Sequence, residues 1–103
     1  MNRTIKQTWL AKLRSGAYKQ ARNRLRDGDL FGPCGILCDM HPDGNWNGRA
    51  YQTVTGGYYC TVPPEVLEWS GLDLLDEVSI MAMNDIDGLE FSEISDWIEK
   101  EIR

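Results

Sequence analysis

Long apolar runs are absent from this sequence. No stretch approaches the roughly 18 consecutive apolar residues that a membrane-spanning helix requires. The first residues, MNRTIKQTWLAKLRSG, also lack the apolar core of a secretory signal peptide. We therefore expect no membrane association and a location in the cytoplasm.

Residues suited to catalysis are scarce. The chain has one histidine and three cysteines, an odd number that argues against a disulfide framework in a reducing compartment. It has no phosphate-binding loop, and no nucleophile, base and orienting group can be assembled around the single histidine. The sequence therefore predicts a protein that is not an enzyme and that needs no cofactor.

The segment CGILCDMH, residues 34–41, raises the question of a metal site. Cys34, Cys38 and His41 could combine with Cys60 into the Cys3His set that holds structural zinc. In an extended strand, however, the first two thiols stand about 13 Å apart at 3.3 Å per residue, which is too far to share one ion. The apolar residues between them favour a buried strand with reduced cysteines. We expect no metal, and the sequence leaves open whether the four side chains converge.

The net charge of −5 conceals a division along the chain. Residues 1–26 carry eight basic residues and no acid, whereas residues 27–103 carry the other three basic residues and all 16 acids. Such a division is typical of a protein whose basic part meets an anionic partner. The alternative is that the two segments face each other inside the fold or across a homo-oligomer.

Apolar residues at helical spacing open the chain. Ile5, Trp9 and Leu13 predict a helix over residues 3–15. A second, shorter helix is expected over residues 18–26.

Glycine, proline and aspartate then separate three runs typical of strands, at residues 34–40, 49–54 and 58–62. The last two runs flank Thr55-Gly56-Gly57 and predict a hairpin. A turn-rich loop, residues 41–48, precedes it.

Helices are expected again after Pro63-Pro64. The first is short and closed by Gly71, and the next begins at Asp73 and runs to Asn84. Ser92 is expected to cap the last. The apolar stripe expected on the 73–84 helix consists of Leu74, Leu75, Val78, Met81 and Ala82. The chain should form one domain, residues 1–103, of the α+β class: N-terminal helices, a small antiparallel sheet with a hairpin, and C-terminal helices.

The segment YKQARNRLR is the best candidate site for an anionic ligand. Arginine binds phosphate oxygens through two parallel hydrogen bonds, and an adjacent tyrosine could stack on a base. The ligand would be a nucleotide or a nucleic acid. The alternative is a structural network of ion pairs with the acidic half. The candidate ligand-binding residues are Tyr18, Lys19, Arg22, Arg24, Arg26 and Arg49.

The last helix is rich in acids and is a candidate surface for a basic protein partner. A solvated helix face is the commoner explanation of such a pattern. The candidate partner-binding residues are Glu90, Glu93, Asp96 and Glu99.

Four stretches, taken together and in this order, resemble a group of small, mostly uncharacterised proteins encoded by bacteriophages and prophages: WLAKLRSGAYKQARNRLR, GILCD, VPPEVLEWSGL and MAMNDIDGLEFSEISDWIE. The clearest signatures are LRSG-x-Y-x-Q, PPEV-x-EW-x-GL and MND…F-x-EI-x-x-x-IE. Pro33 departs from the pattern, since another cysteine or a bulky residue is more typical before Cys34.

The resemblance implies a phage accessory protein in the cytoplasm of the host cell. Such a protein would bind a host factor, such as a defence system, and modulate or inhibit it. Alternatively, it would bind or sequester a phosphate-bearing signal.

Overall fold

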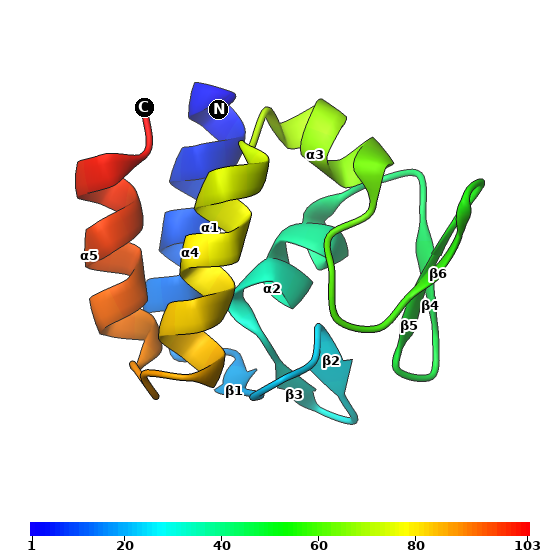
Figure 1. Cartoon of the computed structure of the whole chain (residues 1–103), viewed down its shortest axis with the longest axis horizontal. Helices are drawn as coiled ribbons and strands as arrows, with labels where there is room; N and C mark the ends of the chain where they lie inside the picture. The colour runs from blue at the N-terminus through cyan, green and yellow to red at the C-terminus, as the bar shows by residue number, and fades with distance from the viewer.

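Five helices form the larger part of the fold, and two small sheets complete it (Figure 1). The computed structural model describes residues 1–103 and confirms the α+β class. The helices are α1 (Arg3–Arg14), α2 (Pro33–Met40), α3 (Pro64–Ser70), α4 (Leu74–Asp85) and α5 (Phe91–Glu101). The strands are β1 (Lys19–Gln20), β2 (Arg26–Asp27) and β3 (Leu30–Phe31) in one sheet, and β4 (Asn45–Asn47), β5 (Ala50–Thr53) and β6 (Gly56–Tyr58) in the other.

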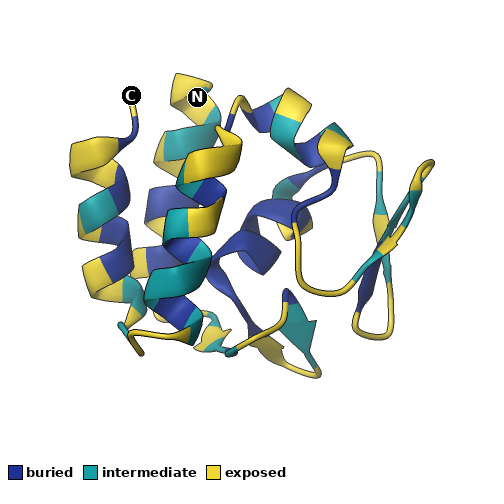
Figure 2. Cartoon of the chain, in the orientation of Figure 1, coloured by how far each residue is buried: buried dark blue, intermediate teal, exposed yellow.

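Helix α2 lies at the centre of the molecule. It contacts α1 and α4, and α5 in turn contacts both of these helices, while the β4–β6 sheet lies on the far side of α2 from α5 (Figure 1). The core gathers residues from all five helices (Figure 2). None of the helices combines the length and the apolar character needed to cross a membrane.

The predicted first helix is confirmed. Asn2 caps α1, because its side chain accepts a hydrogen bond from the N–H of Ile5. Trp9 is fully buried, and its Nε1 donates to the carbonyl oxygen of Pro33 at 2.8 Å. This bond ties α1 to the first turn of α2.

The strand predicted over residues 34–40 is wrong, because this segment is helix α2. Pro33 stands in its first turn, where proline needs no N–H partner. Ile36, Leu37 and Cys38 have no exposed surface. Only Asp39 of this helix is exposed, so its sequence lacks the periodicity that distinguishes a short helix from a buried strand.

The helix predicted over residues 18–26 is also wrong. The segment contains β1, which pairs in parallel with β3, and β2, which pairs with β3 in antiparallel fashion. Asn23 has a left-handed φ of 63°, which interrupts any helix. Its N–H donates to Asp85 at 2.8 Å, so contacts with the distant end of α4 replace the local helical bonds.

The predicted hairpin is confirmed in a different register. Thr53 pairs with Gly56, so the turn consists of Val54-Thr55, and Gly56 belongs to β6. The strand expected over residues 58–62 ends at Tyr58. The loop expected over residues 41–48 contains β4, which pairs with β5 and makes the sheet three-stranded.

The C-terminal helices follow their sequence signals closely. Gly71 closes α3 with a φ of 72°, and the carboxylate of Asp73 caps α4 by accepting from the N–H of Leu75. The expected cap at Ser92 is wrong, because Glu90 is the N-cap of α5 and forms a capping box with Glu93.

Candidate functional site

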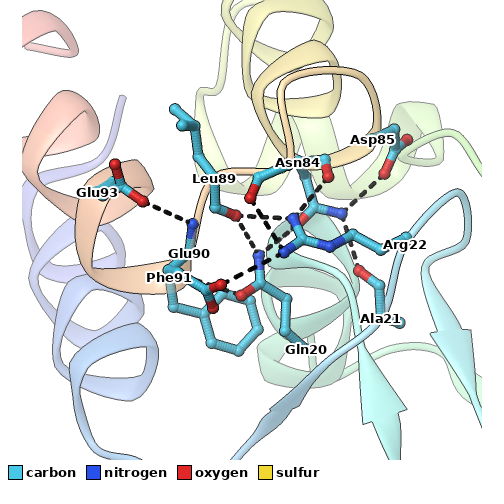
Figure 3. A network of polar contacts seen from close by, with 10 residues as sticks. Gln20, Ala21, Arg22, Asn84, Asp85, Leu89, Glu90, Phe91 and Glu93 are labelled. Carbon is cyan, nitrogen blue, oxygen red and sulfur yellow. Dashed lines mark hydrogen bonds and ion pairs between the residues drawn. The ribbon is translucent and has the colours of Figure 1, made fainter.

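The basic segment is held largely by contacts within the protein. Arg22 donates to the carbonyl oxygens of Asn84 and Leu89, both at 2.7 Å, and its guanidinium lies 3.9 Å from Glu90 (Figure 3). Gln20 donates to the side-chain oxygen of Asn84 at 2.6 Å and to the carbonyl oxygen of Leu89 at 2.8 Å. Arg22 thereby satisfies a carbonyl group that the end of α4 leaves without a helical partner, and both side chains bind the carbonyl group of Leu89 in the turn before α5. Arg22 therefore fastens the turn between α4 and α5.

Two other predicted ligand-binding residues, Tyr18 and Arg26, lie against the ring of Phe31. Tyr18 meets this ring edge-on and donates its hydroxyl proton to Asp39 at 3.0 Å, and burial raises the pKa of that hydroxyl. The guanidinium of Arg26 lies 4.9 Å from the centroid of the same ring. Arg49 forms an ion pair with Asp27 at 3.0 Å.

Lys19 and Arg24 are exposed and form no hydrogen bond or ion pair through their side chains. The structure thus brings Tyr18 and Arg26 to one ring and directs Arg22 to a different place. The six predicted residues do not converge on one pocket.

The predicted acidic surface on α5 is also engaged internally. Arg14 binds Glu99 at 2.6 Å and Asp96 at 2.9 Å, which links α1 to α5 and raises the pKa of the guanidinium. Glu90 and Glu93 form the capping box at the start of the helix. Each of the four acids therefore has a structural partner.

The cysteines and the histidine do not converge. Cys34 and Cys38 are buried in α2, where burial raises the pKa of both thiols. Cys60 is exposed, and its Sγ contacts the carbonyl oxygen of Asn23. His41 bonds through Nδ1 to the hydroxyl of Tyr51 at 2.9 Å. No three histidine, cysteine or acidic side chains are grouped so that they could hold a metal ion.

Helix α4 exposes much of the apolar stripe expected on it. Leu74, Leu75 and Val78 are 61%, 75% and 56% exposed, whereas Met81 and Ala82 are partly buried. The helix instead buries Glu77 and Asn84 together with an isoleucine between them. The two polar residues are accommodated because Val62 N–H donates to Glu77, and Asn84 donates to a backbone carbonyl.

A groove lies beside this exposed stripe. It has a volume of about 700 Å³ and is bounded by α4, α3 and the segment that leads from β6 to α3. Most of its lining is apolar. The apolar and aromatic residues of its wall include Tyr58, Val62, Leu67, Leu74, Val78 and Met81.

Carboxylates are the only charged groups in this groove. Glu77 and Asp85 line it, and no lysine, arginine or histidine occurs between residues 50 and 99, a stretch with eleven acids. Glu77 is 2% exposed, and burial raises the pKa of its carboxyl group. Sequence reasoning missed the groove because its wall also includes residues of α3 and of the segment after β6, which only the fold brings to α4. The absence of basic residues from this stretch is visible in the sequence.

Fold and groove together define a small α+β domain with an open apolar groove on an acidic surface. The chain belongs to the family described as Domain of unknown function (DUF8296), whose model it matches over residues 1–102. No curated protein and no solved structure matches it.

Proposed function

We propose that this chain is a non-enzymatic binding protein that holds a partner protein through the α3–α4 groove and thereby modulates or inhibits it. The partner would be a protein of the cell that a bacteriophage infects. The phage-type signatures of the sequence support this choice of partner. The groove takes the place of the α5 acids as the contact surface, because the α5 acids already have partners within the fold.

One observation carries this proposal: α4 exposes an apolar stripe with no covering element. Leu74, Leu75 and Val78 are each more than half exposed, and Ile86 just beyond the helix is 82% exposed. Contiguous apolar surface rimmed by polar groups is typical of protein interaction sites. The acids around it would attract a basic partner and disfavour acidic ones.

A matched pair of valine variants tests the proposal. Val78→Asp places a charge in the groove, whereas Val54→Asp makes the same change at the tip of the β5–β6 hairpin, outside the groove, where the side chain is 95% exposed. Partners captured from host lysate by the wild type are identified, purified and titrated against each variant by calorimetry. We expect Val78→Asp to weaken binding by at least about tenfold and Val54→Asp to leave it unchanged. Equal affinities would refute the assignment of the groove.

A phosphate-bearing ligand is the second candidate, and one observation favours it: Lys19 and Arg24 are exposed and unpaired. Their neighbour Arg22 is already bound to carbonyl groups. Titration of cyclic nucleotides and short oligonucleotides at two salt concentrations tests this function, since binding through cations weakens as salt rises. The absence of salt-sensitive binding would exclude it.

A further inference from the structure

The carboxylate of Glu77 has no counter-charge, although almost all of its surface is buried. One oxygen accepts the N–H of Val62 at 2.6 Å, and the carboxylate forms no other hydrogen bond and no ion pair. A carboxylate offers about four acceptor positions. Asn84, buried on the same side of α4, forms hydrogen bonds through both its amide nitrogen and its amide oxygen. Glu77 thus keeps most of its acceptor positions unused, and it lines the groove.

The ridge beside Glu77 has the geometry of a helix-packing surface. Leu74, Val78, Ala82 and Ile86 recur at intervals of four residues, and all four line the groove. Rows of this spacing are the ridges that pack into the grooves of a neighbouring helix. At 1.5 Å per residue, the row extends over about 18 Å, a length matched by three to four turns of a second helix.

Charge specifies the second helix further. Because Glu77 and Asp85 are the only charged groups lining the groove, an acidic helix would meet like charge there. Lysine or arginine in an otherwise apolar face can bury its stem along the groove and place its cation at Glu77. A charged head group would then fill the acceptor positions that the protein itself leaves open.

We infer that the groove binds an amphipathic helix of the partner, and that a lysine or arginine within the apolar face of this helix pairs with Glu77. The inference rests on the proposed function and specifies the partner's chemistry. It commits to a partner helix in place of a second copy of this chain, because helix α1, the basic helix of this protein, buries its own apolar residues Trp9, Leu10 and Leu13 in the core.

Three synthetic peptides of about 14 residues test the inference, a length that covers the ridge at 1.5 Å per residue. All three place leucine at helical spacing, and one position inside the leucine face is lysine, glutamine or glutamate. Binding is measured by fluorescence anisotropy. We expect the lysine peptide to bind about tenfold more tightly than the glutamine peptide, and the glutamate peptide to bind most weakly.

Two charge-removing variants of α4 locate the effect. Glu77→Gln should remove the preference for lysine and leave the affinity for the glutamine peptide within about twofold. Asp76→Asn removes the same charge one residue earlier, outside the groove, and should leave the preference intact. Val78→Asp should weaken the binding of all three peptides.

The failures can be told apart. If the peptides bind in the groove but Glu77→Gln leaves the lysine preference unchanged, the pairing with Glu77 is overturned and the proposed function stands. If no peptide binds but a purified host partner still binds in a Val78-dependent manner, the inference that a helix occupies the groove is overturned. If neither binds, the proposed function fails as well. Concentration-dependent dimers that Val78→Asp dissolves, seen by analytical ultracentrifugation, would assign the groove to a second copy and overturn the inference.

Discussion

Replacing Gly35 by alanine tests the central packing of the fold. An added Cβ would lie 1.7 Å from the carbonyl oxygen of Leu25 and 2.6 Å from its carbonyl carbon. Both are backbone atoms, so no side-chain rotation can relieve the clash. The Leu25 oxygen is also held in place, because it accepts the N–H of Gly32 at 2.8 Å. Helix α2 or the Leu25 segment must therefore move by more than an ångström.

The cost follows from where α2 lies. Ile36 and Leu37, which follow Gly35 in this helix, have no exposed surface, so a shift of the helix disrupts packing on several sides at once. Overpacking a core costs about 1–3 kcal/mol when side chains can adjust. Because backbone opposes backbone here, we expect a loss at or above about 3 kcal/mol of the free energy of unfolding, partly offset by about 1 kcal/mol from the higher helix propensity of alanine.

Urea denaturation followed by circular dichroism measures this loss. Gly48→Ala is the matched control: its φ is +61° and no atom lies within 4 Å of the added Cβ, so it should lose only the cost of a left-handed alanine, about 1 kcal/mol. If Gly35→Ala destabilises the protein no more than Gly48→Ala does, the close approach of α2 to Leu25 is refuted.

Three further predictions concern the ionisable groups. A thiol reagent should modify only Cys60 in the native protein and all three cysteines in denaturant, because burial raises the pKa of the two thiols in α2; rapid modification of more than one native thiol would contradict this. A double-mutant cycle between Arg14 and Glu99 should give a coupling of about 0.2–1 kcal/mol that decreases with salt, since the pair is largely exposed; a coupling insensitive to salt would contradict it. Glu77→Gln should stabilise the protein more at pH 7 than at pH 4. The raised pKa of Glu77 means that its contribution to stability is present below the ordinary glutamate pKa and is lost as pH rises through the folded value; an equal effect at both pH values, measured by urea denaturation, would count against it.

Helices with a local start or stop signal were predictable. Asp73 before α4 and Gly71 after α3 bond to backbone groups within four residues of themselves, so the local sequence is enough to predict these helix ends. Helix α2 lacked a one-sided pattern, because six of its eight residues are buried. Only its proline start signal was available, and the apolar run after it fits a strand equally well.

Long-range hydrogen bonds explain the failure at residues 18–26. Gln20 and Arg22 bond to residues that follow more than sixty positions later, Asn84 near the end of α4 and Leu89 in the turn before α5. These contacts outweigh the modest helical propensity of the segment. Sequence periodicity detects only the propensity and not the long-range contacts. The basic character that suggested a phosphate site is used at Arg22 to satisfy carbonyl groups.

The orientation of α4 could not be read from hydrophobicity. Buried Glu77 and Asn84 find partners in Val62 and Ala21, which belong to other parts of the chain, and the exposed leucines have no such partner. A periodicity argument assumes that the apolar face of a helix is the inner face. That assumption fails for α4, because its inner face carries polar groups with hydrogen-bond partners and its outer face exposes leucines.

The distribution of ion pairs favours the groove over α5 as the proposed contact surface. The four ion pairs of the fold involve Asp27, Glu90, Asp96 and Glu99. None involves an acid between residues 65 and 87, where seven acids border or line α3, α4 and the turn after α4. The basic N-terminal segment therefore pairs with Glu90, Asp96 and Glu99 and with no acid around the groove. Since unpaired charge steers a partner of opposite sign, we expect the division of charge along the chain to act next to the exposed ridge of α4, where the acids form no ion pair.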